Sequence, residues 1–178
     1  FSPVEWKSGQ ASTTITTSET GYTLQYQIGE ITEGSWTNTT SGSVIGNLQH
    51  GQIVYGRLFD GTNGSKTANI DVQDDIEPQQ ATISLSGTSA TTAGSVTATV
   101  TLKDNESGVN ATASKWTYNT NSGNIGTNES SYNNNFSSNG QTITLKATTA
   151  GTYYLHVLTV DNAGNKKETI SNAVTVRK

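Results

Sequence analysis

The stretch that decides the fold reads Gly-Thr-Tyr-Tyr-Leu-His-Val-Leu-Thr-Val-Asp-Asn-Ala-Gly-Asn and occupies residues 151–165. A weaker copy, Gly-Gln-Ile-Val-Tyr-Gly-Arg-Leu-Phe-Asp-Gly-Thr-Asn, occupies residues 51–63. Each copy begins with glycine, continues through a run of β-prone residues and closes on Asp before a Gly/Asn turn, which is the pattern of one strand with its flanking turns. Because the copies lie about a hundred residues apart, the sequence predicts two domains of one kind.

The composition favours strands and excludes several classes of partner. Charged residues make up 13% of the chain and hydrophobic residues 31%, and Thr-rich alternation is typical of sheets with one solvated face rather than of charged, disordered chains. The net charge is -4, and the few basic residues are scattered, so no surface is predicted to bind nucleic acid. No apolar run reaches the roughly 20 residues that a membrane-spanning helix needs, so no membrane insertion is expected.

Two residue types are absent from the chain. There is no Cys, which excludes disulfides, thiolate metal sites and cysteine nucleophiles. The chain begins at Phe1 and contains no Met, and from this we expect a segment of a longer, secreted protein.

Alternation and turn residues predict an all-β architecture with two domains, at residues 1–73 and 80–178, joined by a short extended linker at residues 74–79. Val96, Ala98, Val100 and Leu102 alternate with polar residues, which is the period of a half-buried strand. The second domain is predicted to have about seven strands and no helix, with residues 119–135 forming a long Asn/Ser/Gly-rich loop that contains a short edge strand. The strands expected in the first domain cover residues 13–17, 22–28, 43–48, 53–60 and 66–72, and Trp36 lies at the edge of a loop between the second and the third of them.

Residues 151–155 resemble the corner of an immunoglobulin-type sandwich, in which a Tyr anchors its hydroxyl to the preceding corner. Here Tyr153 is that residue, and Leu155 stands where antibodies have a Cys. The resemblance implies that Val100 or Ala98 faces Leu155 as an apolar pair, and that Trp116 is buried between the two sheets.

Two further motifs resemble bacterial Ig-like repeats. They are Lys-Asp-Asn-Glu-Ser-Gly-Val at residues 103–109 and Val-Asp-Asn-Ala-Gly-Asn at residues 160–165. Such repeats occur in tandem in surface proteins, adhesins, secreted glycoside hydrolases and phage tail proteins. The resemblance therefore implies two tandem immunoglobulin-like β-sandwiches, although the sandwich itself hosts many functions.

Acidic residues at strand ends and in the linker raise the question of calcium, which prefers six to eight oxygen ligands. The candidate ligands are Asp71, Asp74, Asp75 and Asp161. The alternative is that these side chains cap turns by local hydrogen bonds, as Asp commonly does. For residues 104–108 the tight turn is favoured over an ion site, with Gly108 at positive φ.

The sequence offers no catalytic arrangement. His50 lies at a predicted turn and His156 in mid-strand, on the face opposite Tyr153 and Leu155. Neither has a Ser/Asp partner or a second metal ligand at useful spacing, so both are predicted to be surface residues and no enzyme activity is expected.

Aromatic side chains provide the candidate ligand site, because a flat ring stacks on the apolar face of a sugar. The candidates are Trp36, Tyr132 and Tyr154, with Trp36 foremost; the alternative is that they pack in a core or at its edge.

Taken together, these patterns predict a non-catalytic spacer or display module that supports adhesion. It would belong to a larger bacterial extracellular or cell-surface protein, or to a phage virion, and its partners would be the neighbouring domains of the parent chain. The alternative is a module that binds a carbohydrate or a cell-surface receptor through residues 119–135 or exposed aromatics.

Overall fold

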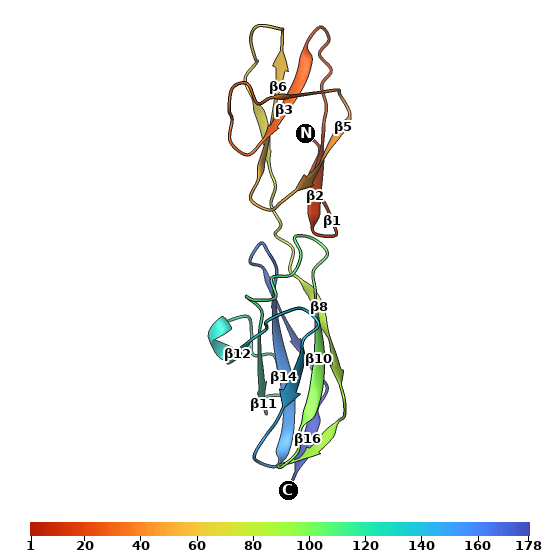
Figure 1. Ribbon diagram of the computed structural model, residues 1–178, viewed down its shortest axis with the longest axis vertical. Coiled ribbons are helices and arrows are strands. Elements are labelled where there is room, and N and C mark those ends of the chain that lie inside the picture. Colours follow the sequence, from red (N-terminus) through yellow and green to blue (C-terminus); the bar gives the residue numbers. More distant parts are fainter. The chain divides into compact units, whose positions relative to one another are not determined.

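The computed structural model describes residues 1–178, which form two compact units, Phe1–Asp75 (unit 1) and Ile76–Lys178 (unit 2) (Figure 1). Both units consist of strands joined by turns, and one 3₁₀ turn, η1 (Glu129–Ser131), is the only helical element. No helix in the structure has the length and hydropathy needed to cross a membrane.

Unit 1 is a sandwich of a three-stranded and a four-stranded sheet, with strand orders β1-β2-β5 and β4-β3-β6-β7. Every pairing within these sheets is antiparallel. The strands are β1 (Glu5–Lys7), β2 (Gln10–Ile15), β3 (Thr23–Ile28), β4 (Thr37–Thr39), β5 (Ser43–Leu48), β6 (Ile53–Phe59) and β7 (Ala68–Asp71). Short strand β1 is not foreseen from the sequence, because three residues are too few to show a period.

The core of unit 1 lies between its two sheets and is entirely aliphatic at its centre. Leu48, Val54 and Val72 are fully buried there, and Leu24 joins them from β3. Burying such side chains stabilises the fold by about 1.5 to 3 kcal/mol each. Unit 1 therefore has a core of its own.

Unit 2 is also a sandwich, with strand orders β13-β10-β8 and β12-β11-β14-β16-β9, and β15 pairs with β14. All pairs are antiparallel except β9 with β16, which is parallel. The strands are β8 (Gln79–Leu85), β9 (Ser89–Thr91), β10 (Val96–Lys103), β11 (Lys115–Asn119), β12 (Asn134–Asn135), β13 (Thr142–Leu145), β14 (Gly151–Val160), β15 (Lys166–Ile170) and β16 (Val174–Arg177). The predicted fold, two immunoglobulin-like β-sandwiches, is confirmed, as is the short edge strand within residues 119–135.

Strand β10 shows why the alternating pattern is informative. Its burial alternates residue by residue, and Val100 and Ala98 lie in the same buried cluster as Leu155 of β14. The apolar set expected in place of a disulfide is thus present. Trp116 packs against this cluster but stays partly exposed.

The corner before β14 has the expected geometry. The Tyr153 hydroxyl donates to the backbone oxygen of Thr149 at 3.2 Å and lies 2.7 Å from the Thr149 hydroxyl. The Tyr153 ring also stacks on Tyr118 with 5.2 Å between centroids. Burial raises the pKa of the Tyr118 phenol above its ordinary value, and Tyr153 adds to the shift.

The turn at residues 104–108 also forms as predicted. Gly108 has a φ of 86°, a conformation that glycine adopts without steric cost. Its backbone N–H donates to Oδ2 of Asp104 at 2.6 Å. The carboxylate therefore closes the turn.

The second half of β14 departs from alternation, because residues 155–160 are buried on both faces. Leu155 and Val157 face the inter-sheet core, whereas Leu158 and Val160 belong to a second cluster with Tyr132, against which Ile125 packs. Residues 119–135 therefore lie over the outer face of the sheet and bury it, and we call this segment the loop cover.

Candidate functional site

Three sets of side chains are candidates for function: the surface around Trp36, the polar groups under the loop cover, and the acidic residues. Trp36 directly precedes β4, and its ring is partly buried. The guanidinium carbon of Arg57 lies 4.1 Å from the centroid of the Trp36 ring and 5.5 Å from that of Phe59. We call these three residues the Trp36 stack. Cation–π contacts of this kind contribute about 0.5 to 1 kcal/mol each at exposed sites.

The antiparallel register of β3 and β6 holds Arg57 in place. Gln25 is the register partner of Arg57, and its Oε1 accepts a hydrogen bond from Nε of Arg57 at 2.9 Å. Nη1 of Arg57 pairs with Oε1 of Glu33 at 3.2 Å, and the Arg57 side chain is only 11% exposed. The cation is therefore fixed against the Trp36 ring.

A hollow of about 380 Å³ opens beside the Trp36 stack. Besides the stack itself, Gln25, Glu33, Gly34 and Thr62 line it. The indole Nε1 of Trp36 has no hydrogen-bond partner. An aromatic ring surrounded by amide, carboxylate, guanidinium and hydroxyl groups has the mix of stacking surface and polar anchors that small-molecule sites use.

The other two aromatic candidates differ from Trp36. Tyr132 is only 5% exposed and packs in the second cluster of unit 2, and its hydroxyl donates to the backbone oxygen of Gly126 at 2.7 Å. The predicted ligand-binding role of Tyr132 would require an exposed ring face, whereas the structure buries this ring. Burial raises the pKa of the Tyr132 phenol well above its ordinary value, and Glu168 adds to the shift. Tyr154 is half-buried on β14, where it pairs in register with Asn119.

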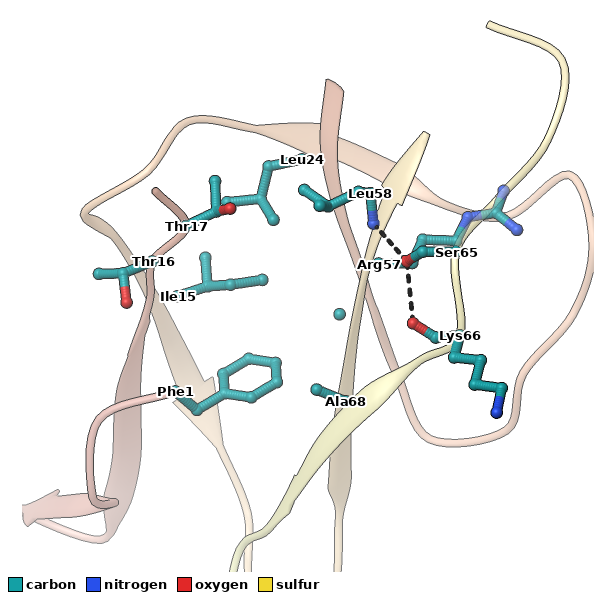
Figure 2. Close-up of a pocket in the computed structure, with 11 residues that line it drawn as sticks. Phe1, Ile15, Thr16, Thr17, Leu24, Arg57, Leu58, Ser65, Lys66 and Ala68 are labelled. Atoms are coloured by element: carbon teal, nitrogen blue, oxygen red, sulfur yellow. Dashed lines mark hydrogen bonds between the residues drawn. The ribbon is translucent and has the colours of Figure 1, made fainter. Parts of the chain in front are cut away.

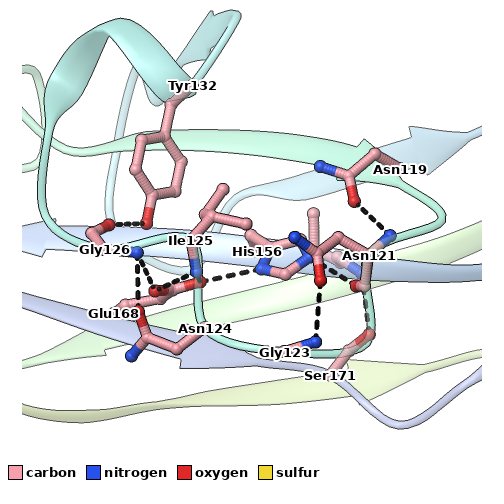
Figure 3. A network of polar contacts seen from close by, with 11 residues as sticks. Asn119, Asn121, Gly123, Asn124, Ile125, Gly126, Tyr132, His156, Glu168 and Ser171 are labelled. Carbon is pink, nitrogen blue, oxygen red and sulfur yellow. Dashed lines mark hydrogen bonds and ion pairs between the residues drawn. The ribbon is translucent and has the colours of Figure 1, made fainter.

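A network of polar contacts lies under the loop cover and is centred on His156 and Glu168 (Figure 3). Nδ1 of His156 lies 2.8 Å from Oε1 of Glu168, and Nε2 lies 2.9 Å from the backbone oxygen of Asn121. The two side chains are 0% and 1% exposed. The prediction that His156 is a surface residue is therefore wrong, because the loop cover buries the face of β14 on which it lies.

The Glu168 side chain also binds the backbone of the loop cover. Its carboxyl oxygens accept hydrogen bonds from the backbone N–H groups of Ile125, at 3.0 and 3.1 Å, and of Gly126, at 2.9 Å. These bonds attach the backbone of residues 125 and 126 to β15. Since Asn121 O only accepts, Nε2 of His156 donates to it, and the contact with Glu168 then requires a proton between Nδ1 and the carboxyl group.

The geometry of His156 bears on catalysis. Both ring nitrogens are occupied by contacts within the protein, and the side chain has no access to solvent. A general base must reach the proton that it abstracts from a substrate. The arrangement therefore ties a loop to a sheet rather than exposing a base.

His50, in unit 1, accepts a hydrogen bond at Nδ1 from the backbone N–H of Asp74 at 3.0 Å.

An exposed ion-pair network reinforces the same loop. Glu129 of η1 pairs with Lys166 at 2.9 Å and with Lys115 at 3.4 Å. Hydrogen bonds from Lys166 and then Lys115 hold the pKa of the Glu129 carboxyl below its ordinary value. The loop cover is thus attached at a buried and at an exposed point.

The four acids considered as calcium ligands are divided between the units. Asp71, Asp74 and Asp75 lie at the end of unit 1, at and after the last residue of β7. Asp161 lies in unit 2, where its carboxyl group accepts hydrogen bonds from the backbone N–H and the side-chain amide of Asn165 at 2.8 and 2.9 Å. This is the turn-capping arrangement. Within unit 2, one of its carboxyl oxygens lies within 4.8 Å of a carboxyl oxygen of Asp104.

No family model and no curated protein matches the chain. Similar solved structures include the chicken interferon gamma receptor alpha chain, with 10% identity, coverage of 99% of this chain and 98% of that chain, and a TM-score of 0.47. A two-domain fibronectin type-III segment of chicken tenascin has 15% identity, coverage of 96% and 97%, and a TM-score of 0.47. The D0-D1 domain of intimin has 14% identity, coverage of 98% and 96%, and a TM-score of 0.38. Identities this low bear on the fold alone, and at these TM-scores the assignment of two sandwiches rests on the sheets described above.

Proposed function

We propose that the chain is a non-catalytic spacer or display module of a larger extracellular protein, bacterial or carried on a phage virion, in which it supports adhesion by other parts of the parent chain. The observation that carries the proposal is that each unit has its own core between two sheets. A domain with its own core holds its shape without help from its neighbours. Neighbouring domains of the parent chain are its expected partners.

The buried polar groups support a structural role. His156 and Glu168, which would be the natural acid–base pair of an enzyme, are both used to fix the loop cover. Outer-face residues such as Thr99 and Thr101 of β10 are exposed and uncharged. Such a surface remains hydrated without a strong electrostatic field, which suits a module that separates the functional domains of a parent chain.

The Trp36 stack favours a second candidate function, binding of a carbohydrate. The experiment that separates the two functions is titration of the labelled 178-residue protein onto a broad glycan array, with calcium and with chelator. The spacer proposal predicts no saturable binding in either condition. Saturable binding to one glycan class would replace it with the carbohydrate-binding function, and loss of that binding with chelator would show that a metal ion takes part.

If a glycan binds, we expect Trp36→Ala to weaken its binding about tenfold or more, because one aromatic face contributes on the order of 1.5 kcal/mol. The matched control is Tyr55→Ala, which removes another partly buried aromatic ring of unit 1, on β6 but outside the hollow. Equal affinity of the wild-type and Trp36→Ala proteins for the same glycan would exclude the Trp36 stack as the site.

A further inference from the structure

A second hollow region of unit 1 has a mainly apolar surface and lies between its two sheets (Figure 2). Figure 2 shows Phe1, Ile15 and Leu24 on one side of this cavity, facing Leu58 and Ala68 on the other. The cavity has a volume of about 220 Å³, which is below the roughly 300 to 1,000 Å³ of typical small-molecule sites. It suits one aliphatic side chain, and we call it the apolar slot.

Two small residues, Gly56 and Ala68, line the apolar slot. At Gly56 of β6 an added Cβ would lie 2.8 Å from Cδ1 of Ile15 and 3.0 Å from Cζ of Phe1, both shorter than normal carbon contacts. Ala68, at the start of β7, supplies only a methyl group. The absence of a Cβ at Gly56 therefore lets Ile15 and Phe1 pack directly against β6, whereas a larger side chain at Ala68 would enter the slot.

An acidic hollow of about 450 Å³ adjoins the slot, and Leu58 and Ser65 line both. Tyr22 stands in this hollow with 53% of its surface exposed. Glu19 and Asp60 lie in the same hollow. The exposed ring and the two carboxylates together present a surface that attracts a cation.

The two carboxylates have no cationic partner in the protein. None of the salt bridges of the chain involves Glu19 or Asp60. Oδ1 of Asp60 accepts hydrogen bonds from the backbone N–H groups of Asn63 at 2.6 Å and Thr62 at 2.7 Å. These bonds hold the pKa of the Asp60 carboxyl below its ordinary value, and the bond from Asn63 has the larger effect. The charge of Asp60 is therefore present at neutral pH.

We propose that the apolar slot and the acidic hollow together bind an extended segment of a partner protein that carries an aliphatic side chain next to a Lys or Arg. Charge complementarity assigns the basic residue to the hollow and the aliphatic residue to the slot. Lys66 lines the slot but not the hollow, which further directs the cation toward Glu19 and Asp60. The outer edge of β7 pairs with no other strand, so backbone groups are available beside the slot. This interaction goes beyond a spacer role and does not depend on it.

The test uses capped tetrapeptides titrated into the ¹⁵N-labelled 178-residue protein, with amide shifts of unit 1 as the readout. Gly-Leu-Lys-Gly should shift amides of the residues that line the slot and the hollow. Replacing its Leu by Ser should weaken binding about tenfold or more, and replacing its Lys by Glu about threefold or more. Equal binding of all three peptides, or shifts located elsewhere, would overturn the proposal.

Variants of the protein make the test specific. Ala68→Leu fills the slot from an exposed position and should weaken binding of Gly-Leu-Lys-Gly about tenfold. Glu19→Gln combined with Asp60→Asn removes both charges, keeps the acceptor oxygen that closes the turn, and should weaken binding about threefold to tenfold. The control is Glu5→Gln, an exposed acid on β1 outside both cavities, which should bind as the wild type does. If the two cavity variants bind the peptide as tightly as this control, the proposal fails.

Discussion

Replacing Glu168 by Gln lowers the free energy of unfolding of unit 2 by about 3 kcal/mol, because a buried carboxyl group that contacts His156 and accepts two backbone N–H groups is replaced by an amide, and buried polar groups left poorly paired cost about 1 to 3 kcal/mol each. The substitution leaves His156 facing an amide in a site where both side chains are almost fully buried. It also weakens the acceptors of the Ile125 and Gly126 N–H groups. Urea denaturation gives the loss of stability, and hydrogen exchange at these two amides should become faster than in the wild type.

Two comparisons identify the cause of this loss. Glu129→Gln removes the exposed carboxylate that binds Lys115 and Lys166, and we expect a much smaller loss. Combining H156L with E168L removes the ring as well as the carboxyl group but leaves the Ile125 and Gly126 N–H groups without their acceptor, so we expect this variant also to be less stable than the wild type. The account is contradicted if E168Q is as stable as the wild type, or if it is less stable while both amides exchange at the wild-type rate.

Replacing Leu155 by Ala lowers the free energy of unfolding of unit 2 by about 3 kcal/mol. Leu155 is fully buried in the inter-sheet core of unit 2, in one cluster with Ala98 and Val100. Truncating a buried Leu removes its transfer free energy and leaves a cavity, at a cost of about 2 to 5 kcal/mol. Differential scanning calorimetry should show one transition moved to lower temperature and the transition of unit 1 unchanged.

The control for this substitution is Val44→Ala on β5, because Val44 is 68% exposed and its truncation removes little packing. We expect the melting profile of Val44→Ala to match that of the wild type. A parallel fall of both transitions in Leu155→Ala would contradict the view that the two cores are separate.

Strands with one solvated face could be predicted from the sequence with good accuracy. In β10 the alternation of Val96, Ala98 and Val100 with threonines gives both the strand and its buried face. The Tyr153 corner is equally accessible to prediction, because its hydrogen bond to Thr149 lies within five residues of the chain. Local patterns thus predict local structure.

The burial of His156 could not be predicted from alternation, because the loop cover that buries it comes from 35 residues earlier in the chain. A signal is nevertheless present. Leu158 and Val160 lie on the same face of β14 as His156, and Leu155 and Val157 lie on the opposite face. Residues 155–160 therefore form a nearly continuous apolar and β-branched run. Such a run is typical of a strand covered on both faces. It also predicts that an adjacent loop must supply apolar partners, as Ile125 and Tyr132 do.

Only part of the surface around Trp36 could be predicted from the sequence. The place of Trp36 at a loop edge and its candidacy as a ligand site are readable from the sequence, whereas the short strand β4 that follows it is not. Its stacking on Arg57 depends on the register of β3 against β6, which no local pattern reveals. For the same reason the cavities beside Leu58 emerge only when strands distant in the sequence are brought together.

The central claim, that the chain is a spacer made of two independently folded sandwiches, is tested most directly by pulling single molecules from their two ends in a force spectrometer. The account predicts two separate unfolding events. Residues 1–75 should release at most about 270 Å of chain and residues 76–178 at most about 370 Å, less the length of each folded unit. A single event that releases both lengths together, or extension without measurable resistance, would contradict the account.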